Sequence, residues 1–87
     1  MEDVELKINE YGTKFYYIKG TDILHREDGP AIEFSNGSKE WFQHGKNHRL
    51  NGPAIEWVDG YKEYWINDKY IPNVNSIEEA IIKSLLE

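Results

Sequence analysis

The chain has 87 residues, a formal net charge of −6 and no cysteine. A chain of this size forms one small domain, and the lack of cysteine excludes disulfides and thiolate metal sites. The acidic balance argues against binding nucleic acid or an anionic membrane through a basic surface. No apolar run approaches the roughly 18 residues of a membrane-spanning helix, and the acidic start is unlike a signal peptide, so we expect a cytoplasmic protein.

The first predicted element is a degenerate β-hairpin over residues 4–20. Its two arms, VELKI and KFYYI, are rich in β-branched and aromatic residues and flank a turn at residues 10–12. The segment GTKFYYIKG has the same spacing as GSKEWFQHG and GYKEYWIND further along the chain. This hairpin is therefore a degenerate first copy of a repeat.

Two full copies follow, repeat 1 over residues 24–46 and repeat 2 over residues 47–70. The segment LHREDGPAIEFSNGSKEWFQHG returns 23 residues later as NHRLNGPAIEWVDGYKEYWIND. The Asn-Gly and Asp-Gly dipeptides inside the copies predict two-residue hairpin turns, in which both central residues take positive φ. The Gly-Pro dipeptides predict the links between hairpins, where a missing backbone N–H is tolerated.

The chain is expected to end in a short helix over residues 76–86. Ser76 and Glu79 form a capping box at its start. A helix this short is unstable alone, so we expect it to cover the apolar face of the sheet. Its own apolar face is predicted to consist of Ile77, Ala80, Ile81 and Leu85. The expected fold is one mainly β domain, an antiparallel meander of about three hairpins with a C-terminal α-helix.

The repeat resembles the MORN repeat in its length, its Asp/Asn-Gly turn, its aromatic pair and the glycine that follows the pair. The form LHREDGPA is similar to a divergent variant found in small phage and bacterial proteins. The resemblance implies a fold of successive hairpins. It does not extend to lipid binding, because the repeated histidine is followed by arginine (Arg26 and Arg49) rather than glycine, and because the chain is acidic.

Counting outward from two-residue turns assigns the strand residues to two faces. Glu33 then lies opposite Glu40, and Glu56 lies opposite Glu63. Directly opposed like charges destabilise a strand pair, so the repeated arginine bridges these carboxylates, or they form an ordinary solvated face, or a basic partner neutralises them. The other face is predicted to form the core, and it carries Tyr16, Ile32, Phe34, Trp41, Ile55, Trp57 and Tyr64.

Three histidines are candidate metal ligands: His25 and His48 at equivalent repeat positions, and His44 at a strand end. Imidazole suits zinc and nickel. The spacing matches no compact metal motif, however, and a residue that recurs with a repeat is best explained by a recurring structural role. We therefore expect no metal and no cofactor. Asp28 and Asn51, just before the Gly-Pro dipeptides, are expected to cap backbone N–H groups of the links.

Catalysis finds little support in the sequence. A carboxylate pair does acid–base work in a pocket that separates the two pKa values, and a flat sheet offers no obvious cleft. Ser35 and Ser38 flank a turn rather than a histidine base, and no glycine-rich phosphate loop precedes a helix. The sequence therefore predicts a protein that is not an enzyme and has no catalytic residues.

Protein binding is the expected function. An acidic face with aromatic side chains can dock on a basic surface, since carboxylates imitate phosphates and rings supply contact area. The resemblance implies a small phage or bacterial accessory protein, acting in the host cytoplasm on a host protein such as a nucleic-acid-handling or anti-phage defence enzyme. The predicted partner-binding residues are Tyr17, Glu33, Glu40, Phe42, Glu56, Glu63 and Trp65.

Two alternatives stay open. A meander of hairpins leaves an exposed sheet edge, so the chain could instead be a self-associating structural protein, a homodimer with no inhibitory role. The high aromatic content also leaves room for a carbohydrate site on the aromatic columns.

Overall fold

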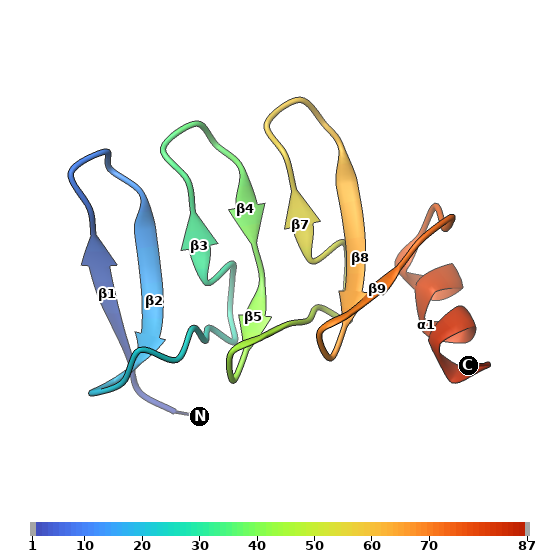
Figure 1. Ribbon diagram of the computed structural model, residues 1–87, viewed down its shortest axis with the longest axis horizontal. Coiled ribbons are helices and arrows are strands. Elements are labelled where there is room, and N and C mark those ends of the chain that lie inside the picture. Colours follow the sequence, from blue (N-terminus) through green and yellow to red (C-terminus); the bar gives the residue numbers. More distant parts are fainter. Residues whose placement is uncertain (1, 87) are drawn as a thin grey trace.

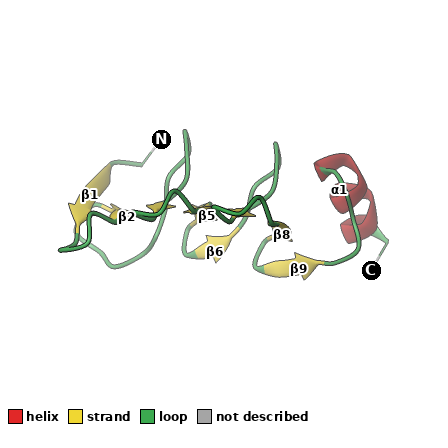
Figure 2. Cartoon of the chain, turned by 90° about the horizontal axis from the view of Figure 1, so that it is seen from above, coloured by secondary structure: helices red, strands yellow, loops and turns green. Residues whose placement is uncertain are grey.

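The computed structural model describes residues 2–86, which form a single-layered antiparallel sheet with a helix at one end (Figure 1). The molecule measures 39 × 29 × 16 Å, and its shortest dimension holds one sheet and the loops that rise from it (Figure 2). The elements are β1 (Val4–Ile8), β2 (Lys14–Ile18), β3 (Ile32–Glu33), β4 (Lys39–Glu40), β5 (Phe42–Gln43), β6 (Lys46–Asn47), β7 (Ile55–Glu56), β8 (Lys62–Ile66), β9 (Lys69–Ile71) and α1 (Ile77–Leu85).

Seven of these strands follow one another across the sheet in the order β1-β2-β3-β4-β7-β8-β9, all antiparallel. The strands β5 and β6 form a separate two-stranded ribbon at the lower end of β4. The predicted class, an antiparallel β meander with one short C-terminal helix, is confirmed. Within the described residues no helix is long and apolar enough to cross a membrane.

The turns at Gly12, Gly37 and Gly60 each contain three residues. In each turn the glycine N–H donates to the carbonyl three residues earlier, and φ is positive at the glycine but not at the residue before it. This geometry is a type I turn followed by a one-residue bulge. The expected two-residue turns at Asn36-Gly37 and Asp59-Gly60 are therefore wrong, and only the first hairpin was assigned its correct loop length.

The two-residue turns lie at the opposite ends of the hairpins, at His44-Gly45 and Asn67-Asp68. All four residues have positive φ, with values of 50°, 80°, 49° and 70°. The first turn joins β5 to β6 and the second joins β8 to β9. Only one of the four is glycine, which is why the sequence signal was weaker here than at the Asn-Gly and Asp-Gly dipeptides.

Neighbouring hairpins are joined near their upper turns by buried hydroxyl groups. Thr13 Oγ1 accepts the backbone N–H of Ser35 at 3.3 Å, and Ser38 Oγ accepts that of Val58 at 2.9 Å. Thr13 and Ser38 are both buried, so each satisfies a backbone donor that water does not reach easily. These bonds fix the position of each three-residue turn against the next hairpin.

The hydrophobic core is small and divided. A cluster at the C-terminal end brings Tyr64, Ile71 and Ala80 together, with Ile66, Val74 and Ile77 against it. The remaining buried apolar residues are Ala31, Ile32, Ala54 and Ile55, which belong to the links and the strands that follow them. Because no second layer covers most of the sheet, other contacts must hold its aromatic side chains in place.

The helix α1 closes the end of the sheet rather than covering its face. It packs against β8 and β9 through the Tyr64–Ile71–Ala80 cluster, and Ser76 accepts the N–H of Glu79 as the predicted N-cap. The prediction that α1 covers an apolar sheet face is wrong. Leu85, predicted to pack, is 78% exposed, because a helix that lies beyond the last strand has only one side to bury.

Replacing Gly60 by alanine is expected to lower the free energy of unfolding by about 1 kcal/mol, because φ is 94° and a Cβ is disfavoured there. Apart from its chain neighbours, no atom lies within 4 Å of the added methyl group, so the loss reports on the backbone alone. Gly60→Asn should cost less, since asparagine tolerates positive φ better. Urea unfolding measures both variants, and unchanged stability of the alanine variant would contradict the turn assignment.

Candidate functional site

The register of repeat 1 separates its two glutamates. Glu33 lies opposite Lys39 and Glu40 lies opposite Ile32. The predicted Glu33/Glu40 pair is therefore wrong, because the extra residue in the turn moves each partner by one position. Residues directly opposite share a face and successive residues alternate, so the two carboxylates point to opposite faces of the sheet.

Repeat 2 has the same arrangement. Glu56 lies opposite Lys62 and Glu63 lies opposite Ile55, so the predicted Glu56/Glu63 pair is also wrong. Across both repeats, one face carries a row of alternating charge, which we call the charged row: Lys14, Glu33, Lys39, Glu56 and Lys62. The opposite side, which we call the open face, carries the row Phe15, Ile32, Glu40, Ile55 and Glu63.

The predicted core face is divided in the same way. Tyr16, Trp41 and Tyr64 lie on the face of the charged row, whereas Ile32, Phe34, Ile55 and Trp57 lie on the open face. The assignment of all seven to one core is wrong for the same reason, a one-residue error in each turn.

Arg26 shields Tyr16 on the face of the charged row. Its guanidinium carbon lies 4.1 Å from the centre of the Tyr16 ring, a cation–π contact. Its Nε donates to Asp28 at 3.1 Å, and its Nη1 donates to the carbonyl of Pro30 at 3.1 Å and lies 3.8 Å from Glu33. A single side chain thus ties the link to the sheet.

Arg49 repeats this arrangement over Trp41. The guanidinium carbon is 3.8 Å from the indole, Nε donates to Asn51 at 3.0 Å, and Nη1 donates to the carbonyl of Pro53 at 3.0 Å and to Glu56 at 2.9 Å. We call each of these arrangements an arginine bracket. Each bracket neutralises the one strand glutamate it contacts, Glu33 or Glu56, so the expected role of the repeated arginine holds for one member of each predicted pair and not for Glu40 or Glu63.

The glycine of each link makes room for its bracket. A Cβ on Gly29 would lie 2.8 Å from the guanidinium carbon of Arg26, and a Cβ on Gly52 would lie 2.8 Å from that of Arg49. The Asp28 and Asn51 side chains bind arginine Nε, so the predicted capping of backbone N–H groups by them is corrected. The repeated sequence HR-x-D/N-GPA encodes the bracket.

The open face keeps five of the seven predicted partner-binding residues. Trp65 lies two residues after Glu63 in β8 and Tyr17 lies two residues after Phe15 in β2, so each pair shares the open face, and Phe42 holds the position of Trp65 in the preceding repeat. Glu63 accepts the indole N–H of Trp65 at 2.9 Å and that of Trp57 at 3.3 Å. Glu33 and Glu56 do not join this group, because they lie on the other face within the brackets.

Glu40 occupies an unfavourable position for a carboxylate. Burial raises its pKa, a hydrogen bond from Asn47 opposes that rise, and the negative charge of Glu63 adds to it. No ion pair among residues 2–86 includes Glu40 or Glu63. The charge of these two carboxylates is therefore not neutralised by any ion pair within the described part of the chain.

The recurring histidines have the same structural role in both repeats. Nδ1 of His25 accepts the backbone N–H of His44, and Nδ1 of His48 accepts that of Asn67, each at 2.9 Å. Each histidine thus binds the first residue of a two-residue turn. Because a backbone N–H can only donate, Nδ1 is unprotonated in both rings.

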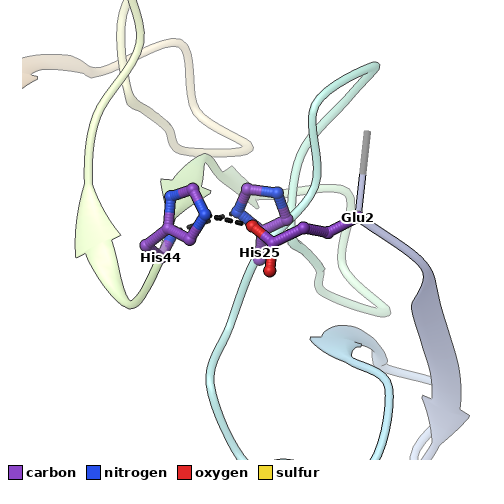
Figure 3. Close-up of side chains that lie close together, drawn as sticks. All are labelled: Glu2, His25 and His44. Atoms are coloured by element: carbon purple, nitrogen blue, oxygen red, sulfur yellow. Dashed lines mark hydrogen bonds and ion pairs between the residues drawn. The ribbon is translucent and has the colours of Figure 1, made fainter.

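Glu2, His25 and His44 lie close enough to suggest a metal site (Figure 3), with ligand atoms within 4.8 Å of one another. The acceptor role of His25 Nδ1 argues against it, because the ring proton then sits on Nε2 and neither nitrogen has a free lone pair. Among residues 2–86 the buried Nε2 has no hydrogen-bond partner and lies 3.7 Å from Glu27, whereas His44 contacts Glu2. His48 belongs to the other repeat and is not a member of this cluster.

A groove of about 880 Å³ runs between the two links, with Trp41 and the bracket of Arg49 on its wall. Its polar lining mixes acidic groups, such as Glu27 and Asp28, with Lys46 and two histidines. Nε and Nη1 of Arg49 already donate hydrogen bonds within the bracket, and no serine, threonine or cysteine is among the lining residues. The groove therefore has no hydroxyl or thiol nucleophile, and its lining carries both signs of charge.

The brackets were missed in the sequence. The signal was present, because arginine, glycine and an aromatic residue recur together in both copies. Nothing in the spacing showed that Tyr16 lies under Arg26, since the contact crosses from one hairpin to the next link.

No protein family, no curated protein and no solved structure matches the chain. The resemblance to MORN repeats therefore rests on the sequence pattern described above.

Replacing Gly52 by alanine is expected to lower the free energy of unfolding by about 1–2 kcal/mol, because the new Cβ displaces the guanidinium of Arg49 from its ring and hydrogen bonds. Gly52 is not among the glycines with positive φ, so its backbone tolerates alanine. In an Arg49→Met background the same substitution should cost almost nothing, a coupling that a double-mutant cycle by urea unfolding measures. An equal loss in both backgrounds would contradict the bracket.

Acidification is expected to destabilise the fold through His48. Desolvation lowers the pKa of His48, so the folded state binds the proton less readily than the unfolded state. The stability that neutral His48 contributes to the fold is fully present above the unfolded-state pKa of about 6.5. It is lost as the pH falls through the lower pKa of the folded state. His48→Asn keeps an acceptor near the Nδ1 position and does not titrate, so its unfolding free energy should fall less between pH 7.5 and 5. If the unfolding free energies of the native protein and of His48→Asn fell equally with pH, this role of His48 would be contradicted.

Proposed function

We propose that this chain is a non-catalytic protein-binding module whose open face receives basic side chains of a partner protein. The observation that carries the proposal is that two of the four strand glutamates contact an arginine and the other two do not. Glu33 and Glu56 are within 4 Å of an arginine, whereas Glu40 and Glu63 are not part of any ion pair among the described residues. A partner's lysine or arginine would supply the missing charge.

The aromatic residues beside these carboxylates suit the same ligand. Lysine and arginine bind over aromatic rings as well as to carboxylates. The chain contains an example on this face, since Lys7 Nζ lies 5.4 Å from the centre of the Tyr17 ring. Phe42 and Trp65 occupy the equivalent positions in the two later hairpins and are half-buried, so part of each ring stays accessible.

The two carboxylates are held in place before a partner arrives. Both oxygens of Glu63 accept an indole N–H, and Glu40 is hydrogen-bonded to Asn47. Groups that are already ordered lose less conformational entropy on binding. Burial and the charge of Glu63 raise the pKa of Glu40, and a bound cation would oppose both effects.

The charge of the open face defines the class of partner as a protein with a basic surface. Proteins that hold nucleic acid present such surfaces, and the resemblance of the repeat to small phage and bacterial proteins supports a host enzyme of nucleic-acid handling or defence as the target. The net charge of −6 would speed the encounter at low ionic strength.

The proposal is tested by NMR titration with a hexa-arginine peptide. We expect the indole N–H signals of Trp57 and Trp65 to shift, and Glu63→Gln or Glu40→Gln to weaken binding about three- to tenfold. Raising the salt concentration should weaken binding further, because the pairs are near the surface.

Glu56→Gln is the matched control, since it removes the same charge from the other face of the sheet. It should reduce affinity only as far as the change in net charge requires. Equal losses for Glu56→Gln and Glu63→Gln, or shifts confined to the face of the charged row, would show that the open face is not the binding surface.

A further inference from the structure

We infer that a second copy of this chain is the partner of strand β1, which pairs with itself across a two-fold axis. The pairing surface is the backbone edge of β1, whose Glu5 and Lys7 side chains lie on the open face, and the inference does not depend on the proposed function. It rests on the exposed edge of β1 and on the order of the side chains in its sequence, VELKI.

Within the described residues no strand pairs with the outer edge of β1. Lys19 N–H donates to the carbonyl of Asp3 and Asn9 N–H donates to that of Thr13, so odd-numbered residues of this strand bond to β2. In an antiparallel pair the residues between them point their N–H and C=O groups the other way. Val4, Leu6 and Ile8 therefore direct these groups outward.

The side chains of the same three residues form an exposed apolar stripe. Val4, Leu6 and Ile8 are 39%, 44% and 58% exposed, and their side chains lie on the face of the charged row. Natural proteins guard such an edge with proline, a bulge, a very short strand or charged side chains. The strand β1 has five residues in unbroken register with β2 and contains no proline or bulge, and its two charged residues, Glu5 and Lys7, have opposite signs.

The strand is complementary to itself when two copies run antiparallel about Leu6. Leu6 then meets Leu6, Val4 meets Ile8, and Glu5 meets Lys7, so apolar side chains pair on one face and opposite charges pair on the other. The outward backbone groups of the three apolar positions form the hydrogen-bonded pairs in this register, which gives about six new hydrogen bonds.

Other registers lose this match. Sliding the copies by two residues, which keeps the backbone bonds, places Glu5 opposite Glu5 or Lys7 opposite Lys7. Like charges directly opposed destabilise a strand pair. The two charged residues of β1 therefore select the symmetric register.

The other end of the sheet limits the assembly to two copies. There β9 has only three residues, Pro72 follows it directly, and α1 packs beside it. Proline lacks the N–H that a further strand would need. Pairing through β1 alone gives a closed dimer rather than a fibre.

Analytical ultracentrifugation of the full chain tests the inference. We expect a species of twice the 10.2 kDa chain mass, and Glu5→Lys or Lys7→Glu alone should raise the dimer dissociation constant about tenfold or more, because each creates two like-charge pairs. The double variant restores both pairs and should dimerise like the native chain. An equimolar mixture of the two single variants should form a heterodimer.

Several results would overturn the inference. A monomeric native chain at several hundred micromolar would do so, as would single variants that dimerise normally. Glu5→Lys also makes the chain less acidic, so if overall repulsion governed association this variant would dimerise better and the double variant would show no rescue. Unfolding curves check that both single variants are folded, since both side chains are exposed in the monomer.

Discussion

The arginine bracket is the contact on which this sheet depends. A single-layered sheet leaves the rings of one face without a second layer, and here a guanidinium covers Tyr16 and another covers Trp41. The third ring in the series, Tyr64, has no arginine and is buried instead by Ile71 and Ala80. The helix α1 thus takes the place that the link of another repeat would occupy. Each hairpin needs the following segment to cover its ring.

The brackets also decide which charges remain for a partner. Glu33 and Glu56 serve the fold, within the charged row and beside an arginine. Glu40 and Glu63 lie beyond the reach of both arginines, on the face that also carries Tyr17, Phe42 and Trp65. One face of the sheet is therefore occupied by the arginines of its own links, and the other is the proposed binding face; the one extra residue in each turn decides which glutamates lie on which face.

The two ends of the sheet differ as much as its two faces. One end is closed by α1, and the other shows the bare backbone edge of β1. A dimer built on β1 about an axis perpendicular to the sheet would present both open faces on the same side. Two copies of a weak site for basic side chains held in this way bind a single large partner more tightly than one copy does, because the second contact becomes intramolecular. The inferred dimer and the proposed binding face would then support each other.

The sequence by itself determined the repeat, its hairpins, the register of the first hairpin and the capped helix after Ser76, because these depend on local propensities and on residues close in the chain. It did not determine the register of the later hairpins. An Asn-Gly pair suits both a two-residue turn and a three-residue turn, and the tertiary bond from Val58 to buried Ser38 accompanies the longer one. Nor could it place Arg26 over Tyr16. That contact joins a link to the preceding hairpin, and only the folded sheet brings the two together.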